Sequence, residues 1–295
     1  MSAQVPTDIP TDIPTDIPTG DAARSSWSSQ ATVLSTQALT RQFGDFVAVH
    51  RLDLAVQAGE IFGLLGPNGA GKSTAIKMLT TLLSPSSGRA EIAGYELVRQ
   101  AAQVRRQIGY VPQALSADGS LTGYENLLIF AKLYDLPRPT RRYRIREALA
   151  LMGLEEAANR LVRTYSGGMI RRLEIAQSIL HQPAVLFLDE PTVGLDPLAR
   201  SAVWDLVKQL RADYGTTVVL TTHFMEEADS LCDRVAIMHH GQVIVTGTPT
   251  ALKASLHQPN PRLDDVFIHY TGNQLESGGS YRDTSRLRRT TQRLG

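Results

Sequence analysis

One nine-residue segment constrains the fold of this chain more than any other, and we call it the phosphate loop: Gly66, Pro67, Asn68, Gly69, Ala70, Gly71, Lys72, Ser73 and Thr74. It matches G-x-x-x-x-G-K-[ST], the pattern of loops that wrap a nucleotide phosphate. The mostly apolar residues 60–65 before it predict a buried strand, and residues 75–80 after it predict a helix. Because glycine has no Cβ atom, such a loop can close round an anion with its N–H groups pointing inward. We expect Lys72 to reach the β- and γ-phosphates and the Ser73 hydroxyl to bind Mg²⁺.

The composition excludes several classes of protein. The chain has 295 residues and a net charge of +1, so no overall positive field favours nucleic acid. Cys232 is the only cysteine, which rules out a disulfide framework and fits a reducing compartment. The N-terminus does not resemble a secretory signal, and no apolar run approaches the ~20 residues that cross a bilayer. If the protein works at a membrane, we expect another chain to span it.

The two ends of the chain differ from its middle. Residues 1–30 contain the repeated unit Pro-Thr-Asp-Ile, whose regular prolines predict a disordered, mildly acidic arm rather than a helix; a docking tag is the alternative. Residues from Thr271 onward are polar and rich in arginine, which predicts a flexible basic tail. Leu287 and Leu294 stand seven residues apart and leave open a helix that docks on a partner.

Between these ends, the pattern predicts an α/β fold. Two antiparallel strands are expected at 31–39 and 47–56, with a turn at 41–45. Further strands are expected at 60–65, 89–92, 108–111, 184–188 and 217–221, with a hairpin at 234–238 and 242–246. Helices are expected at 75–80, 98–107, 198–214 and 226–231, and the last core helix at 249–256.

No strand pattern stands between Gln113 and Ala184. Residues 122–125 fit a capping box that opens an apolar helix through Tyr134, and further helices are expected at 141–152 and 155–161. We interpret about 114–170 as a helical subdomain inserted into the α/β core. The arginine-rich run 138–146 is interpreted as a solvated helix face, with anionic lipid head groups as the alternative contact.

Two acids follow a buried strand. Residues 184–188 are continuously apolar, and Asp189 and Glu190 come directly after them. This order places both carboxylates at the C-terminal edge of the sheet, beside the phosphate loop. Asp189 suits a Mg²⁺ site, and Glu190, pointing the other way, can polarise an attacking water as a general base. A simple helix cap is the alternative.

A third motif, which we call the signature segment, comprises Ser166, Gly167 and Gly168. Together with Met169 it precedes an amphipathic helix, and by itself it reads as an N-cap serine with two glycines. Its value comes from its position, about midway between the phosphate loop and Glu190.

Taken together, these motifs resemble the ATPase subunits of ATP-binding cassette (ABC) transporters over residues 31–256. The family's motifs occur in order: 66–74 (Walker A), Gln113 (Q-loop), 165–169 (signature), 185–190 (Walker B), 194–196 (D-loop) and His223 (H-loop). The resemblance implies a P-loop NTPase (RecA-like) core with an antiparallel β subdomain and the inserted helical subdomain. Residues 257–295 would then form a C-terminal extension.

The resemblance also assigns roles. Phe43 would stack on adenine, with a buried turn aromatic as the alternative. Gln113 would join Ser73 and Asp189 in holding Mg²⁺, and His223 would contact the γ-phosphate and Glu190. The remaining histidines lack such placement and are expected to be structural.

In this family two subunits face head to tail. The signature segment of one copy would bind the γ-phosphate held by the other copy's phosphate loop, and Asp196 would belong to the same shared site. Tyr165 and Met169 replace the Leu and Gln most common at these places in the family. We expect activity to survive, because Ser-Gly-Gly contacts the phosphate.

Three strings, residues 79–88, 165–172 and 263–267, resemble the ATPase subunits of ABC-2-type exporters, notably the daunorubicin/doxorubicin-resistance group. That resemblance implies ATP and Mg²⁺ as cofactors, a second copy of the chain, and a polytopic membrane permease on a separate chain. It implies ATP hydrolysis that drives export of a drug, antibiotic or lipid-like compound from the cytoplasmic face of the plasma membrane. No nucleic acid is expected as a partner.

Two alternatives stay open. A soluble ABC ATPase could act on the ribosome or nucleic acid, and the basic tail is the one feature that favours RNA. Relatives of that class carry two cassettes or a long inserted coiled coil, whereas this chain has one Walker A and no sustained heptads in residues 75–165. A nucleotide-binding module that never hydrolyses is the other alternative, and Asp189, Glu190 and His223 argue against it.

Overall fold

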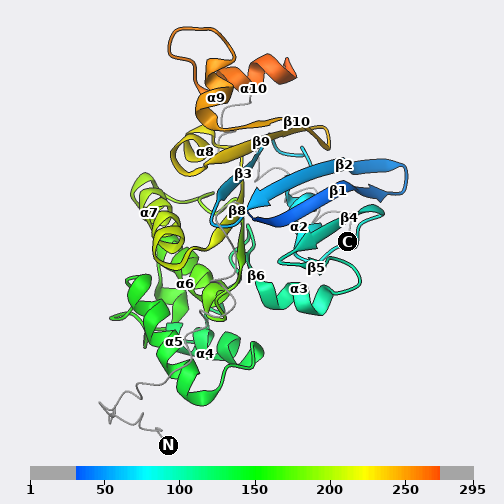
Figure 1. The fold of residues 1–295 in the computed structure, drawn as a ribbon. Helices are drawn as coiled ribbons and strands as arrows, with labels where there is room; N and C mark the ends of the chain where they lie inside the picture. The colour runs from blue at the N-terminus through cyan, green and yellow to red at the C-terminus, as the bar shows by residue number, and fades with distance from the viewer. Residues whose placement is uncertain (1–30, 273–295) are drawn as a thin grey trace, which may run out of the picture.

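The computed structural model describes residues 31–272, so the N-terminal repeat and the leucines at 287 and 294 lie outside the described residues. Its centre is a six-stranded sheet in the order β10-β9-β3-β8-β7-β6 (Figure 1). The strands are β3 (Ile61–Leu65), β6 (Ile108–Val111), β7 (Val185–Asp189), β8 (Thr217–Thr222), β9 (Arg234–His239) and β10 (Gln242–Gly247). β10 pairs antiparallel with β9, and the other pairings are parallel.

The register of this sheet brings the strand ends together. Leu65, the last residue of β3, pairs with Thr222, and Asp189, the last residue of β7, pairs with Thr221. β3, β7 and β8 are buried along their whole length, and for β7 the continuous apolar run 184–188 predicts this. The phosphate loop and the two acids therefore leave the sheet at the same edge, in agreement with the prediction from sequence.

A second sheet is antiparallel, in the order β2-β1-β4-β5, with strands β1 (Thr32–Phe43), β2 (Phe46–Gln57), β4 (Ser87–Ile92) and β5 (Tyr95–Glu96). The predicted turn at 41–45 is too long, because β1 continues to Phe43 and only Gly44 and Asp45 turn. Register shifts along β1 and β2 interrupt the strict alternation of apolar residues, which concealed the end of the strand from the sequence pattern.

Helices cover both faces of the parallel sheet. α2 (Lys72–Leu79) lies between the two sheets and contacts β2, β7 and β8. α3 (Ala101–Gln107) contacts β5 and β6, and α7 (Pro197–Tyr214) and α8 (Met225–Leu231) contact β8. Each face has its own buried core: Phe62 and Leu64 belong to the core on the α2 side, and Ile61 and Leu65 belong to the core on the other side.

The chain does not leave the core after α9 (Pro249–Ala254). A further helix, α10 (Leu263–Thr271), packs on α8, α9 and β10 (Figure 1). Leu263, Val266 and Phe267 are buried, at a spacing that lines one helix face. The prediction that residues 249–256 form the last core helix is therefore wrong.

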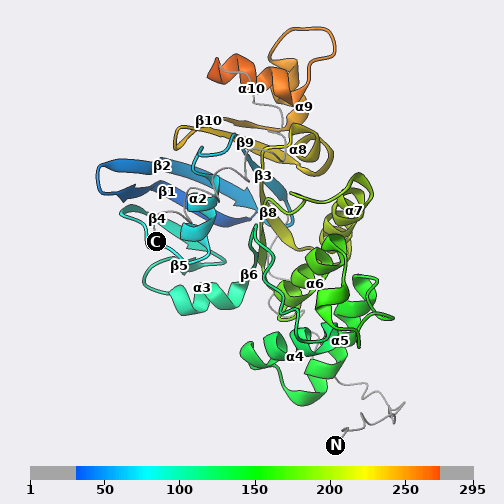
Figure 2. The same ribbon diagram turned by 180° about the vertical axis from the view of Figure 1, so that it is seen from behind.

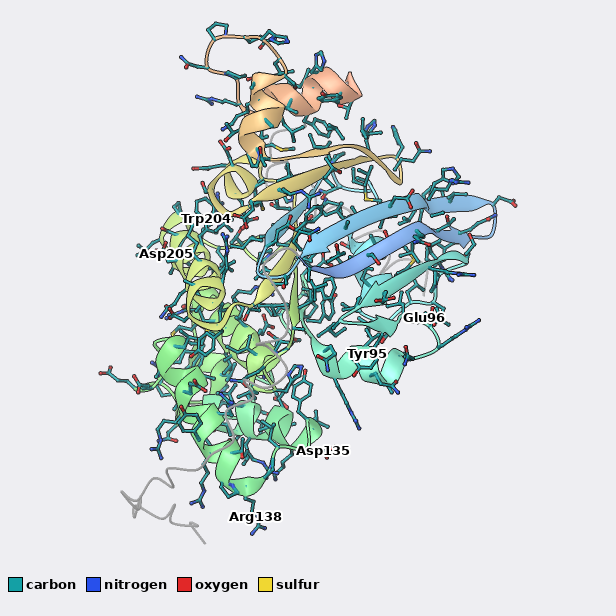
Figure 3. The ribbon with its side chains drawn as sticks, viewed as in Figure 1. Tyr95, Glu96, Asp135, Arg138, Trp204 and Asp205 are labelled. Atoms are coloured by element: carbon teal, nitrogen blue, oxygen red, sulfur yellow. The ribbon has the colours of Figure 1, made fainter. Side chains whose placement is uncertain are left out.

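The helical subdomain contains α4 (Gly123–Leu133) and α5 (Arg138–Leu151), and α6 (Gly167–Ile179) begins in it. Figures 1 and 2, which view the molecule from opposite sides, both place it across the parallel sheet from the antiparallel sheet. Figure 3 shows Asp135 and Arg138 at its far end and Tyr95 and Glu96 in the antiparallel sheet. The predicted capping box is confirmed: the Thr122 hydroxyl accepts a hydrogen bond from the Glu125 amide at 3.1 Å, and the Glu125 carboxylate accepts one from the Thr122 amide at 2.8 Å.

The helix predicted at 155–161 is wrong. These residues form successive turns and are followed by a short 3₁₀ helix, Val162–Thr164. The start of α4 provides the reason, since the Tyr124 amide donates to the Ala158 carbonyl at 2.8 Å and the Gly123 amide to the Arg160 carbonyl at 3.3 Å. These bonds use carbonyls that a helix would need for its own ladder. The interpretation of 138–146 as a solvated face fits the exposure of Arg138, Arg142 and Arg146.

Candidate nucleotide-binding site

The phosphate loop packs closely against the backbone of β2, β9 and the β9–β10 turn. Gly66 has a φ of 157° and Gly71 a φ of 102°. A Cβ atom at Gly71 would lie 2.5 Å from the Ala48 carbonyl oxygen of β2, and one at Gly66 would strike the Met238 carbonyl of β9. The Gly241 amide, in the β9–β10 turn, donates to the Ala70 carbonyl at 3.0 Å. The loop therefore needs glycine for both its dihedrals and its close packing.

Lys72 is the first residue of α2 and is 4% exposed. Its ammonium donates to the carbonyl oxygens of Gly66 at 2.8 Å and Pro67 at 3.1 Å, and lies 3.2 Å from Glu190 Oε1. Three acceptors surround a group that has three hydrogens to donate. The buried charge is thus paired and bonded, as its burial requires.

Asp189 lies beside the loop at the end of β7 and is 2% exposed. Its Oδ1 accepts hydrogen bonds from the Ser73 hydroxyl at 3.1 Å and from the Thr221 hydroxyl at 2.6 Å. The Asp189 carboxylate therefore lies beside the Ser73 hydroxyl of the phosphate loop, as the sequence predicts.

Glu190 has a left-handed backbone, with a φ of 48°, and its carboxylate contacts a different set of side chains from Asp189. Its Oε1 lies 3.3 Å from His223 Nδ1 as well as beside Lys72, and its Oε2 accepts from Gln113 Nε2 at 3.2 Å. Burial raises the pKa of Glu190, but the adjacent His223 imidazole and Lys72 ammonium lower it more, so the net pKa is below its ordinary value. The carboxylate is therefore ionised at neutral pH and able to accept a proton.

Phe43 lies apart from this cluster, at the end of β1, and is 45% exposed. The Arg41 guanidinium lies 4.4 Å from the centre of its ring. The Arg41 side chain is itself positioned by a hydrogen bond, since its Nη1 donates to the Ser84 carbonyl at 2.9 Å. The ring is thus held by a cation–π contact and presents exposed area to a planar base.

The signature segment lies at the start of α6. Ser166 caps this helix by accepting a hydrogen bond from the Met169 amide at 3.3 Å, and Asp196 caps α7 by accepting one from the Ala199 amide at 2.9 Å. A Cβ atom on Gly168 would lie 2.9 Å from the Ala199 side chain, so the starts of the two helices are close neighbours. Within residues 31–272, no hydrogen bond or ion pair joins the signature segment or Asp196 to Lys72 or Glu190.

Two polar residues of the site were not predicted. Thr221 bonds Asp189 through its hydroxyl and also accepts from the Glu190 amide at 3.0 Å. Glu227 is fully buried on α8 and accepts hydrogen bonds from Thr192 at 2.8 Å and from Trp204 of α7 at 3.0 Å. Thr192 follows Glu190 by two residues, so Glu227 fixes the loop after the acids. An acid in the middle of the apolar face of α8 was the only signal for it.

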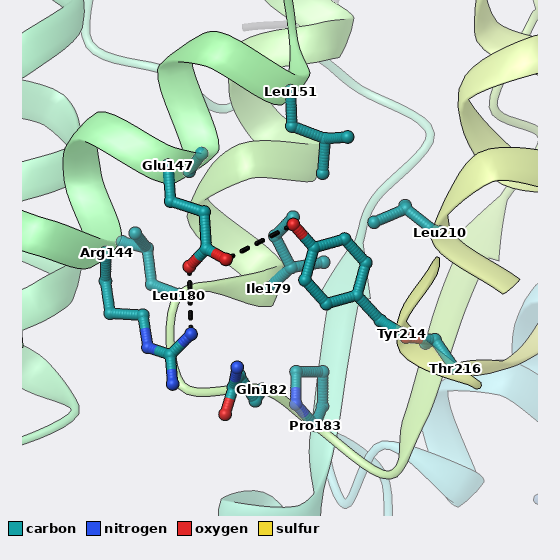
Figure 4. Close-up of a pocket in the computed structure, with 11 residues that line it drawn as sticks. Arg144, Glu147, Leu151, Ile179, Leu180, Gln182, Pro183, Leu210, Tyr214 and Thr216 are labelled. Atoms are coloured by element: carbon teal, nitrogen blue, oxygen red, sulfur yellow. Dashed lines mark hydrogen bonds and ion pairs between the residues drawn. The ribbon is translucent and has the colours of Figure 1, made fainter. Parts of the chain in front are cut away.

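A small cavity between α5, the end of α6 and α7 is not the nucleotide site (Figure 4). Its volume of about 30 Å³ suits a water molecule rather than a nucleotide. Glu147 of α5 bridges across it, with Arg144 Nη1 at 2.8 Å and the Tyr214 hydroxyl at 3.3 Å. Burial raises the pKa of Tyr214, and the Glu147 carboxylate raises it further.

Two features of the described chain bear on what it can bind. Among residues 31–272, no three His, Cys, Asp or Glu side chains are grouped so that they could hold a metal ion. Mg²⁺, however, is usually held by one or two carboxylates together with substrate phosphates and water, and the Ser73–Asp189 pair is a donor set of that kind.

None of the helices in the part of the chain that the structure describes has the length and apolar character that a membrane crossing needs.

The chain is similar to known proteins along most of its length. The ABC transporter family model matches residues 49–193. The daunorubicin/doxorubicin resistance ATP-binding protein DrrA of Streptomyces peucetius is 49% identical over 223 residues, which cover 76% of this chain and 67% of that protein.

Solved structures agree with this match. The structure of an ATP-binding subunit of an ABC transporter superposes with a TM-score of 0.73 at 30% identity, covering 81% of this chain and 100% of the other. A dimeric ATP-binding cassette in a post-hydrolysis state, bound to ADP and Pi, gives a TM-score of 0.64 at 28% identity, covering 73% and 98%.

Proposed function

The chain belongs to the ABC transporter family, and we propose that it drives export of a drug, antibiotic or lipid-like compound through a separate membrane subunit. It is an ATPase of this family and has the P-loop ABC ATPase fold. The substrate class rests on its similarity to a daunorubicin/doxorubicin resistance protein. Because one of the similar solved structures is an ATP-binding subunit of an ABC transporter, that similarity favours this function over an ATPase that acts on the ribosome or nucleic acid.

One observation carries the proposed mechanism of ATP hydrolysis: the Glu190 carboxylate contacts Lys72, His223 and Gln113. We assign Glu190 as the general base that takes a proton from the attacking water. His223 and Gln113 contact the two oxygens of this carboxylate and would orient it. Phosphate oxygens would replace the carbonyls of Gly66 and Pro67 as acceptors for Lys72, which would also draw the ammonium away from Glu190.

The remaining nucleotide contacts follow from the same geometry. We assign the N–H groups of the phosphate loop and the start of α2 to the phosphates, and Phe43 to the adenine ring. Ser73, Gln113 and Asp189 would hold Mg²⁺, since the Ser73 hydroxyl and the Asp189 carboxylate already lie within 3.1 Å of each other. When bound, Mg²⁺ would neutralise negative charge on the phosphate oxygens.

We further propose that the site is completed by a second copy. The signature segment, with Asp196, lies at helix starts that make no hydrogen bond or ion pair to Lys72 or Glu190 within residues 31–272. A head-to-tail dimer would bring these helix starts to the γ-phosphate held by the other copy. The dimeric cassette bound to ADP and Pi among the similar structures supports a dimer of this kind of chain.

The proposed membrane partner is a polytopic permease, which would place the chain at the cytoplasmic face of the plasma membrane. The test is recovery of the full-length chain from detergent-solubilised membranes of its own cells. We expect a polytopic protein to be recovered with it, and we expect cells with Lys72→Ala to lose resistance to the exported compound. Recovery of ribosomes without a polytopic protein would contradict the transporter role.

A further inference from the structure

A buried ion pair on α6 contacts the segment that carries Gln113. Arg171 Nη1 and Glu174 Oε2 lie 3.0 Å apart, one helical turn from each other, and their residues are 1% and 2% exposed. Taking two charges out of water is costly, and such a pair is often no more stable than apolar residues of the same size. Its contacts therefore need an explanation other than stability.

The guanidinium of Arg171 bonds two successive carbonyls. Nη1 donates to the Pro112 carbonyl at 2.7 Å, and Nη2 donates to the Gln113 carbonyl at 2.9 Å. The planar fork of arginine is suited to two parallel bonds of this kind, and a lysine ammonium is not. Arg171 therefore fixes the peptide on each side of the Gln113 α-carbon.

Glu174 bonds the same segment a few residues later. Its Oε1 accepts hydrogen bonds from the Ser116 amide, from the Ser116 hydroxyl at 3.1 Å and from the Ala117 amide at 3.3 Å. One ion pair thus binds the carbonyls at the start of the segment 112–117 and the amides at its end. Within this segment, the Gln113 side chain points to Glu190 Oε2, at 3.2 Å.

We propose that Arg171 and Glu174 are positioning residues for ATP hydrolysis, which set the backbone of Gln113 so that its amide reaches Glu190. This inference rests on the roles proposed above for Gln113 and Glu190. Because both residues belong to α6, the helix that begins at the signature segment, the placement of Gln113 is tied to that helix. Within residues 31–272, the pair bonds neither Lys72 nor Glu190, so in this proposal it acts through Gln113.

The test compares variants of the full-length chain by steady-state ATP hydrolysis and by titration with a fluorescent ATP analogue. Glu174→Gln keeps an oxygen for the Ser116 amide and removes the charge that faces Arg171. We expect kcat to fall about ten- to a hundredfold, since small misplacements of catalytic groups have effects of this size. We expect the Kd for the analogue to change by no more than about twofold, because the phosphate loop is untouched.

Arg171→Lys provides a second route to the same result, since it keeps the charge and loses the fork. The matched control is Glu147→Gln, because Arg144 and Glu147 form an ion pair of the same spacing on α5 that does not contact residues 112–117 (Figure 4). We expect the control to hydrolyse ATP within about twofold of the parent.

A double variant separates positioning from general destabilisation. If Glu174 acts through Gln113, Gln113→Ala with Glu174→Gln will be no slower than Gln113→Ala alone. Multiplied losses in the double variant would overturn the proposal, and so would a parental kcat in Glu174→Gln or, where that variant does not fold, in Arg171→Lys.

Hydrogen exchange gives a readout that does not depend on hydrolysis. We expect the Ser116 and Ala117 amides to exchange faster in Glu174→Ala, which removes their acceptor oxygen, than in the parent or in Glu147→Gln. Unchanged exchange would overturn the proposed contact. A parent that bound ATP without hydrolysing it would instead contradict the proposed function, while this comparison would still test the ion pair.

Discussion

The phosphate loop and the signature segment are both glycine-containing stretches at the start of a helix, yet their surroundings differ. Lys72 at the start of α2 is buried and contacts two loop carbonyls and Glu190. Ser166 at the start of α6 is exposed, and its side chain caps its own helix. The Lys72 side chain is thus enclosed by its own chain, whereas Ser166 faces outward.

This difference separates two kinds of active-site residue. Charged groups gathered at one sheet edge satisfy one another, so each substitution there disturbs several partners within the same chain. An exposed helix start has unsatisfied N–H groups that a phosphate from outside can bind. Substitutions at the phosphate loop should therefore act in the chain that carries them, and substitutions at the signature segment should act on the other copy's ATP.

The largest effect is expected for Lys72→Ala. The change removes the cation that would contact the phosphates and leaves the Gly66 and Pro67 carbonyls without their donor. We expect hydrolysis to fall at least about a hundredfold, because removing a single electrostatic contact to the transition state has an effect of this size. Phosphate release measures the rate, and ATP should no longer raise the melting temperature. Turnover at the parental rate would contradict the site itself.

Glu190→Gln should be nearly as slow while still binding ATP. The amide cannot accept the proton of the attacking water, so we expect kcat to fall about a hundredfold or more with ATP bound. ATP should then hold the two copies together, which size-exclusion chromatography with and without ATP will show. Glu147→Gln, the same change far from the site, should behave as the parent. Hydrolysis by Glu190→Gln at the parental rate would contradict its role as the base.

Mixing two inactive variants tests the contrast between the regions directly. Lys72→Ala and Ser166→Arg should each be inactive, because each damages both sites of a homodimer. In an equimolar mixture, half of the dimers pair an intact loop with an intact signature segment at one site, so roughly a quarter of the parental rate should return. The control mixture of Lys72→Ala with Glu190→Gln should stay inactive, since both changes affect the same side of the site. No recovery in the first mixture would contradict a shared site.

Local patterns predicted the parts of the site that local structure determines. The glycines of the phosphate loop, the apolar strand before it and the two acids after β7 are each a short contiguous pattern with one structural meaning. Parallel pairing then brings Leu65 and Asp189 to the same sheet edge. The fold class and the positions of Lys72, Ser73 and Asp189 followed from this alone.

Contacts between distant segments could not be predicted in the same way. Thr221 and Glu227 join the site only through the register of β8 and the packing of α8, which no local pattern states. Residues 155–161 have a helical pattern, yet bonds from the start of α4 to the Ala158 and Arg160 carbonyls replace the helix. α10 has a single apolar stripe after a proline-containing turn, and only its packing on α8 and α9 makes it part of the core. In these cases tertiary contacts outweighed propensity.

A methyl group added to each region sharpens the contrast in stability. Gly71→Ala places a Cβ atom 2.5 Å from the Ala48 carbonyl, at a φ of 102°, so neither the side chain nor the backbone fits. We expect a loss of about 1–3 kcal/mol in the free energy of unfolding. Gly168→Ala meets only the Ala199 methyl at 2.9 Å and gains helix propensity, so a change within about 1 kcal/mol is expected. Urea unfolding will compare the free energies of unfolding of the two variants. Equal losses would contradict the conclusion that Gly71 is packed closely against backbone and Gly168 is not.

The smallest expected effect is the dependence of stability on pH. Burial raises the pKa of Glu190, but His223 and Lys72 lower it more, so its pKa in the folded state is below the ordinary value of 4.5. The stabilisation it provides is therefore complete above about pH 5 and is lost as the pH falls through the folded-state pKa. Urea unfolding of the parent and Glu190→Gln should differ by a constant amount at neutral pH, and the difference should shrink on acidification. Ser166→Ala removes no ionisable group, so its difference from the parent should not change with pH. If the difference in the free energy of unfolding between the parent and Glu190→Gln grew at low pH, Lys72 and His223 would not be holding the carboxylate ionised. The phosphate-loop region and the signature segment would then differ less in charge pairing than their contacts indicate.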